Sequence, residues 1–186
     1  MTPDAASDGD LATRAAGGDE RAFNALMHRH REGVYRFAHR YVGDADAAYE
    51  VVQETFVSAW RALRRYDPAR PFAVWLRAIA VNKCRDRARR TAVQRLLFGG
   101  RTADLADVFD VGDRSWDTEA SLIAAQRATA VDRAVSELPP QLKEPLLLTV
   151  FDGLSQAQAA QTLGISVKAV ETRVRRAKQR LSRALV

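Results

Sequence analysis

The sequence predicts an all-α protein made of two small helical domains that a flexible linker joins. Three observations lead to this prediction. Few segments alternate between apolar and polar residues as a strand does, helix caps and stops recur along the chain, and the charges fall into separate blocks. Hydrophobic residues make up 47% of the 186 residues, which is typical of a folded protein, and the length allows one ordinary domain or two small ones.

The charge blocks mark the expected domain boundaries. Residues 85–101 hold six arginines against one acid, and residues 166–186 hold seven basic residues against one acid. Between them, residues 102–121 hold six acids against one base and show weak periodicity. We therefore predict a first helical domain over residues 1–92, an acidic linker over 93–117 and a second helical domain over 118–186.

Composition restricts the class of protein further. The formal net charge of +6 favours a polyanionic partner. Cys84 is the only cysteine, which excludes an internal disulfide framework and a cysteine-based zinc site. No apolar run approaches the ~18 residues that span a bilayer, and residues 1–10 lack the basic start and apolar run of a secretory signal. We expect a soluble cytoplasmic protein.

Caps and stops place four helices in the first domain, at about residues 10–16, 20–42, 44–65 and 72–90. Asp19 and Asp44 carry short acidic side chains that cap a helix, and Gly43 lies where the second helix should end. Pro68 and Pro71 fix the loop between the last two helices. The apolar side chains expected to face inward are Phe23, Leu26, Met27, Val34, Phe37, Ala38, Val51, Val52, Phe56, Val57, Trp60, Phe72, Trp75, Leu76, Ile79 and Ala80.

Four further helices are expected in the second domain, over about 118–137, from 140 onward, over 155–163 and over 166–185. Pro145 should remove the hydrogen bond to the Gln141 carbonyl, and so bend its helix or delay its start. Ser155 and Ser166 are the expected caps of the last two helices. Their inward side chains are expected to be Ala159, Ala160, Leu163, Val167, Val170, Val174, Ala177 and Leu181.

These last two helices have the form of a helix-turn-helix, with a tight turn at residues 163–165. A helix fits the major groove, where arginine can bond guanine through two atoms and threonine can contact a base or a thymine methyl. An amphipathic helix with a solvated basic face is the alternative. The turn spacing and the charge blocks favour DNA binding. The residues of this face expected to contact bases or phosphates are Lys168, Glu171, Thr172, Arg173, Arg175, Arg176 and Lys178.

Longer motifs extend this interpretation to the whole chain. Residues 44–90, with VVQETF and WLRAIAVNKCRD, resemble region 2 of the bacterial sigma-70 family. Residues 135–185, with LSQAQAAQTLGISVKAVETRVRRA, resemble region 4. The two segments leave no room between them for a region 3 domain. This arrangement is similar to that of the extracytoplasmic-function (ECF, group 4) subgroup. The strings DPARPF, RLLFGG and ISVKAVE are nearest to ECF members of metal-resistance operons.

The resemblance implies a surface that docks on the β′ clamp helices of core RNA polymerase. Its matching positions are Asp46, Glu50, Gln53, Glu54, Phe56 and Trp60. The residues alone agree that three of these acids lie four apart on one helical stripe, which needs either a basic partner or solvent. Ala47 and Tyr49 stand where the family usually has acids, so this surface is less acidic than is normal for the family.

The resemblance also implies promoter contacts. The loop and helix that follow residue 65 would engage the −10 element and capture a flipped base, for which an opened duplex requires a pocket and a basic surface. The −10 candidates are Tyr66, Asp67, Arg70, Asn82, Lys83, Arg87 and Arg90. Trp75 is expected to pack in the core rather than to stack on a base. Glu171, Thr172, Arg175 and Arg176 match the positions that read the −35 element.

The implied partners are core RNA polymerase, through its β′ clamp helices and β flap, promoter DNA, and a membrane-anchored anti-sigma factor. That factor would hold the protein inactive until an environmental or stress signal arrives, and the linker would lie near the RNA-exit path. No cofactor, metal or small-molecule substrate is expected.

An enzyme is the first alternative. His28 and His30 are two residues apart and point to opposite sides of a helix. The spacings of His28 with Glu32 and of Glu50 with Glu54 suit a metal ligand pair, but surface charge explains them better. The sequence has no glycine-rich phosphate loop and no nucleophile elbow. Basic neighbours could lower the pKa of the Cys84 thiol, although an inert, packed thiol is favoured.

A conventional helix-turn-helix regulator that acts without core polymerase is the second alternative. The VVQETF motif and the proline-bounded loop have no function in such a regulator, and they therefore distinguish it from a sigma factor. A regulatory scaffold that only sequesters another protein is the third, and run-off transcription with core polymerase distinguishes it.

Overall fold

The computed structural model describes residues 6–97 and 119–185, and every regular element in these ranges is helical. The predicted all-α class is therefore confirmed. The elements in chain order are α1 (Asp8–Ala16), α2 (Glu20–Val42), α3 (Ala45–Ala62), η2 (Leu63–Arg65), α4 (Phe72–Leu97), α5 (Glu119–Ser136), α6 (Pro140–Leu146), η3 (Leu147–Phe151), α7 (Gln156–Leu163) and α8 (Val167–Ala184).

Side-chain caps fix the helix starts at the expected residues. Asp19 and Asp44 accept hydrogen bonds from the backbone amides three residues on, and Ser155 and Ser166 do the same for α7 and α8. Gly43 ends α2 in the left-handed conformation at φ 76°, and a Cβ there would lie 3.1 Å from the Ser136 side chain. The backbone angle thus favours glycine at this position, and any other side chain would also press on α5.

Two helices differ from the sequence prediction. α4 continues to Leu97 instead of ending near Arg90, so it enters the segment predicted as linker. α6 passes through Pro145 without ending, and the chain then widens into η3, a π-helical turn. In this turn the hydrogen-bond register changes, and the amide of Asp152 donates to the Leu147 carbonyl, five residues back, at 3.0 Å.

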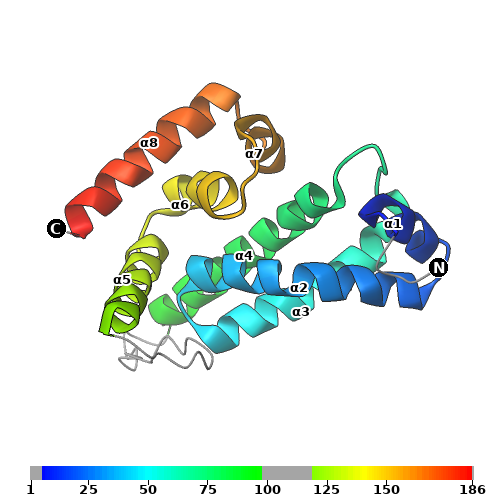
Figure 1. Cartoon of the computed structure of the whole chain (residues 1–186), viewed down its shortest axis with the longest axis horizontal. Helices are drawn as coiled ribbons and strands as arrows, with labels where there is room; N and C mark the ends of the chain where they lie inside the picture. Colours follow the sequence, from blue (N-terminus) through cyan, green and yellow to red (C-terminus); the bar gives the residue numbers. More distant parts are fainter. Residues whose placement is uncertain (1–5, 98–118, 186) are drawn as a thin grey trace.

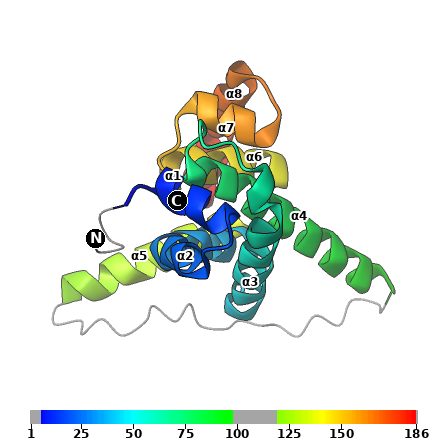
Figure 2. The same ribbon diagram turned by 90° about the vertical axis from the view of Figure 1, so that its right-hand side faces the viewer.

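The helices form two groups that lie against each other (Figure 1). α2, α3 and α4 pack side by side with α1 across one end, whereas α6, α7 and α8 form the second group. α5 crosses the C-terminal end of α2, where Arg40 pairs with Asp132, and α7 contacts α4, so both join the groups (Figure 2). The buried side chains of both groups belong to one continuous apolar cluster, which includes Phe37 of α2 and Leu148 of η3.

Most of the side chains expected to face inward do so, with three exceptions. Val57 on α3 is 50% exposed and Val167 on α8 is 47% exposed, so these two predictions were wrong. Both lie at the edge of an apolar stripe, where a small rotation of the helix decides between core and solvent. Trp60 is 39% exposed and only partly packed. Within the residues described, no helix has both the length and the apolar character to cross a membrane.

Candidate functional surfaces

The acidic stripe of α3 lies on the outside of the molecule. Asp46 and Glu50 are exposed, and Glu54 is half-buried. Glu50 forms an ion pair with Arg87 of α4, and Glu54 accepts a hydrogen bond from Arg90 of the same helix at 3.0 Å. The basic neighbour that the stripe requires is therefore supplied in part by this chain itself.

The aromatic residues of this surface lie at different depths. Phe56 is buried against the ring of Phe23, with ring centroids 6.4 Å apart, and so supports α3 from beneath. Trp60 lies 4.8 Å from the same ring and keeps one part in solvent. Gln53 is exposed beside the acids. The surface available to a partner thus combines carboxylates, an amide and the edge of one indole.

A cavity of about 380 Å³ lies where the start of α1, the loop at 66–71 and the start of α4 meet. Tyr66 is buried in its wall and donates a hydrogen bond to the Arg70 carbonyl at 2.5 Å. Burial, together with the charges of Asp8 and Asp67, raises the pKa of the Tyr66 hydroxyl. The Asp67 carboxylate accepts from the Ala69 amide at 3.0 Å, so the loop is held by its own side chains.

Trp75 packs behind this loop rather than projecting from it. Its ring lies 5.1 Å from that of Tyr66 and 5.4 Å from that of Phe72. This is the core packing expected from the sequence. Asn82 and Arg90 are exposed further along α4, and Lys83 and Arg87 are half-buried. The −10 candidates thus extend from the cavity along one helix.

Two other arginines of α4 face the second group of helices. Arg77 donates to the Asp152 carboxylate at 2.5 Å, with both side chains largely buried. Arg85 donates to both oxygens of Glu144, at 2.7 and 2.6 Å. Burial raises the pKa of Asp152 even though Arg77 lowers it, which indicates that desolvation is the larger effect. Sequence reasoning did not find these pairs.

A buried polar cluster connects α2 with α6. Lys143 donates from Nζ to the carbonyls of Tyr41 at 2.8 Å and Ser136 at 2.5 Å, and the Tyr41 hydroxyl donates to Glu144 at 3.0 Å. Burial lowers the pKa of Lys143 to about 8 and raises that of Tyr41. Burial also raises the pKa of Cys84, which is fully enclosed. A reactive, low-pKa thiol at this position is contradicted.

The outer face of α8 carries the residues predicted to contact the −35 element. Val170 and Ala177 are buried against the rest of the second group. Gly164 provides the turn before α8 with φ 66°. Of the residues predicted to contact DNA, Thr172 and Arg173 are half-buried. The others are exposed: Lys168, Glu171, Arg175, Arg176 and Lys178. Figure 1 shows α8 at the outside of the molecule, as docking in a groove requires.

Comparison with known proteins connects these surfaces to a family. The model of sigma-70 region 2 matches residues 26–93, and that of sigma-70 region 4 matches residues 128–181. The RNA polymerase sigma factor CnrH of Cupriavidus metallidurans is 39% identical over the whole of this chain and 97% of its own length. The chain belongs to the sigma-70 family.

Other relatives place it among the ECF sigma factors of that family. The sigma factor NccH of Alcaligenes xylosoxydans xylosoxydans is 36% identical over 98% of this chain and 96% of its own. The ECF sigma factor SigM of Mycobacterium tuberculosis is 33% identical over 96% of this chain and 85% of its own. The predicted membership of the ECF subgroup is confirmed.

Solved structures of sigma factors show the same fold. CnrH in complex with the cytosolic domain of CnrY is similar with a TM-score of 0.70 at 34% identity, over 96% of both chains. RpoE in complex with the anti-sigma factor NepR, from Bartonella quintana, is similar with a TM-score of 0.72 at 21% identity, over 88% of this chain and 96% of its own.

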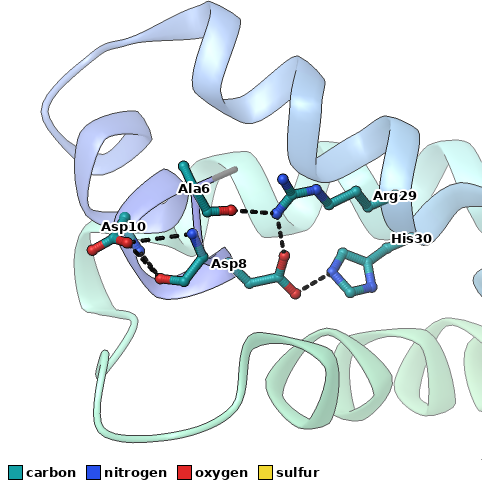
Figure 3. A network of polar contacts seen from close by, with 6 residues as sticks. Ala6, Asp8, Asp10, Arg29 and His30 are labelled. Carbon is teal, nitrogen blue, oxygen red and sulfur yellow. Dashed lines mark hydrogen bonds and ion pairs between the residues drawn. The ribbon is translucent and has the colours of Figure 1, made fainter. Parts of the chain in front are cut away.

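Helix α1 lies outside the two sigma-70 matches. The region 2 match begins within α2, so α1 and its wall of the cavity are not part of it. Asp8 of α1 accepts from Arg29 and lies 2.7 Å from a ring nitrogen of His30, which attaches α1 to α2 (Figure 3). Sequence reasoning missed this attachment because nothing near Asp8 signals a partner more than twenty residues away.

Proposed function

We propose that the protein is a non-catalytic, dissociable specificity subunit of RNA polymerase. One observation carries the proposal: region 2 and region 4 are both matched, and each carries most of its candidate polar residues on the outside of the molecule. Region 2 binds core polymerase and opens the −10 element, and region 4 recognises the −35 element. Because polymerase and promoters are its partners, it acts in the cytoplasm.

Core binding uses the α3 surface, which comprises Asp46, Glu50, Gln53, Glu54 and Trp60 over the buried Phe56. An exposed row of carboxylates beside an indole is complementary to basic helices such as the β′ clamp helices. Since Glu50 and Glu54 already pair with α4, the clamp would exchange one set of cations for another rather than bind bare carboxylates. Region 4 would contact the β flap.

Opening of the −10 element uses the cavity beside the loop at 66–71 together with α4. A strand that leaves the duplex needs a pocket for an unstacked base and cations for its backbone. The cavity supports the first requirement, and Lys83, Arg87 and Arg90 support the second. Release of the α4 cations from Glu50 and Glu54 on core binding would make them available to the DNA strand.

Recognition of the −35 element uses the exposed face of α8. Arg175 and Arg176 are exposed, which supports contacts with base edges, whereas Arg173 and Lys178 would contact phosphates. The solved structures of CnrH with the cytosolic domain of CnrY and of RpoE with NepR support a further partner. We propose that a membrane-anchored anti-sigma factor binds this protein and keeps it from polymerase until a signal arrives.

The decisive test is run-off transcription of fragmented genomic DNA by purified core polymerase, with and without this protein. We expect new transcripts that share a −35 and a −10 sequence and that require both core and this protein. A conventional regulator would instead bind duplex DNA without core and leave the transcript starts unchanged. Absence of new starts, under conditions where a known sigma factor gives them, would overturn the proposal.

A further inference from the structure

We infer that the docking surface on α3 contains an apolar seam, in which Tyr49 and Val57 are specificity-determining residues for binding to core polymerase. The α3 seam comprises Tyr49, Gln53, Val57 and Trp60. Neither Tyr49 nor Val57 belongs to the residues expected to bind core, and Tyr49 stands where the family usually has an acid. The inference rests on the proposed function, because it takes a helix of the β′ clamp as the partner of this surface.

The residues of the α3 seam lie along one exposed stripe of the helix. They are four, four and three residues apart, which places them above one another on a helix with 3.6 residues per turn. Tyr49 and Val57 are each 50% exposed, Trp60 is 39% exposed, and Gln53 is also exposed. Single apolar residues are common on protein surfaces, whereas three on one stripe of an 18-residue helix indicate a face that a partner covers.

Aromatic side chains of α2 hold both ends of the α3 seam in place. The Tyr49 ring lies 4.7 Å from that of Tyr35, which in turn stacks on His39 at 5.7 Å. At the other end, the Trp60 ring lies 4.8 Å from that of Phe23. α2 and α3 lie side by side (Figure 1). Rings that are already fixed lose little side-chain entropy on binding, so they are effective anchors for a partner.

The carboxylates beside the α3 seam contribute little net affinity. Glu50 already pairs with Arg87, and Glu54 pairs with Arg90. A basic partner that takes these carboxylates must displace the two arginines, so one ion pair replaces another and the net gain in free energy is small. The exposed parts of the seam side chains give up only water when a partner covers them. Their burial is therefore the main source of affinity on this surface.

The α3 seam fits an α-helix that carries apolar residues between basic ones. A helix presents side chains three and four residues apart as a ridge, and such a ridge packs along a seam of the same spacing. Asp46 lies three residues before Tyr49 and is exposed, so an arginine of the partner can contact this carboxylate and the tyrosine ring together. Tyr49 thus replaces the charge of the family's usual acid by an apolar ring that still binds a cation.

Competition with a labelled sigma factor for core polymerase tests the α3 seam in the whole protein. Tyr49→Glu is the decisive variant, because it restores the family's usual acid. A purely acidic docking surface predicts that this variant binds core as well as the wild type or better. The α3 seam predicts about tenfold weaker binding, and Tyr49→Phe should recover most of that loss. Raising the salt concentration should weaken Tyr49→Glu more than the wild type, because salt screens charged contacts and not apolar ones.

Val57→Ser tests the α3 seam at a second position. The hydroxyl is smaller and polar, and we expect core binding to weaken about fivefold. Val93→Ser is the matched control, because Val93 is 52% exposed on α4 and lies outside the α3 seam. It should compete as well as the wild type. Circular dichroism of each variant measures its helix content, and should Tyr49→Glu lose helix, the comparison of Val57→Ser with Val93→Ser decides the question.

The outcomes separate the two hypotheses. If the wild type does not compete for core where a known sigma factor does, the proposed function fails and this inference fails with it. If the wild type competes and folded Tyr49→Glu competes equally well, only the role of the α3 seam is overturned. The same conclusion follows if Val57→Ser binds core as tightly as Val93→Ser.

Discussion

Arg85 of α4 donates to both carboxylate oxygens of Glu144 on α6, from Nε at 2.7 Å and from Nη2 at 2.6 Å. Glu144 is only 4% exposed and also accepts from the Tyr41 hydroxyl. A carboxylate of region 4 is thus enclosed by donors of region 2. In this arrangement the two regions are held together by specific polar contacts as well as by apolar packing.

Removing this carboxylate should weaken the whole fold. Glu144→Ala leaves the buried Tyr41 hydroxyl and the partly exposed Arg85 guanidinium without their acceptor. We expect the free energy of unfolding to fall by about 2–4 kcal/mol. Urea denaturation followed by circular dichroism measures it. Glu137→Ala is the control, since Glu137 is exposed and pairs with the exposed Arg133. A loss as small as that of the control would contradict this account.

The ion pair between Arg77 and Asp152 should behave differently. Burial raises the pKa of Asp152 despite the attached arginine, so the attraction does not offset the desolvation of this carboxylate, as is common for buried ion pairs. Asp152→Ala alone leaves a buried arginine and should cost about 3 kcal/mol. The double variant Arg77→Leu with Asp152→Leu should be as stable as wild type or more so. A double variant that is no more stable than the single variant would refute this reasoning.

Lys143 gives a pH dependence of defined sign. Its pKa is lowered from 10.5 to about 8, so between these values the unfolded chain binds more protons than the folded one. Its contribution to stability therefore rises with pH in this window and is least below pH 8. Relative to Lys143→Met, the wild type should gain about 1 kcal/mol between pH 8 and pH 9. Parallel stability curves for the two proteins would exclude the shifted pKa.

Much of the fold follows from local sequence, whereas the contacts between the regions do not. Asp19 and Asp44 mark the helix starts because a cap involves residues three apart. α4 outruns its predicted end because no stop residue occurs before Gly99. Lys143 and Glu144 carry no local signal of burial, since Tyr41 lies 102 residues from Lys143 and Arg85 lies 59 residues from Glu144. Only the folded arrangement reveals that these charges are paired.

The sequence predicted which residues share one face of a helix, but it did not predict which residues of other helices contact that face. The four-residue spacing of Asp46, Glu50 and Glu54 predicts one stripe, and the structure has it on the outside. The spacing contains nothing about Arg87 or Arg90, which reach the stripe from another helix. Sequence patterns of this kind specify what an element presents, and tertiary packing decides what it meets.

Arg176 on α8 tests the −35 assignment. If its guanidinium bonds a base, Arg176→Ala should weaken promoter binding by about 1–3 kcal/mol and relax the preference at one position of the element. Arg183→Ala is the matched control, because Arg183 is an exposed arginine in the last turn of the same helix. It should weaken all promoters alike and reduce the salt dependence. Promoter selection from a randomised −35 library distinguishes the two effects.

Glu54 tests the docking surface on α3. Its carboxylate lies 3.0 Å from Arg90 and 4.0 Å from Lys83, so Glu54→Lys would place three cations together. These pairs are partly solvated, and the free energy of unfolding should fall by only about 1 kcal/mol or less. Binding to core polymerase should weaken about tenfold or more, because a basic partner surface would then meet a cation.

Glu32→Lys is the matched control for this change. Glu32 is an exposed glutamate on α2 that pairs with Arg36 and lies outside the α3 surface. Competition with a labelled sigma factor for core polymerase measures both variants. If Glu54→Lys competes as well as Glu32→Lys and wild type, the clamp does not dock on this face of α3. If both variants lose binding alike, the effect comes from net charge and not from the position of Glu54.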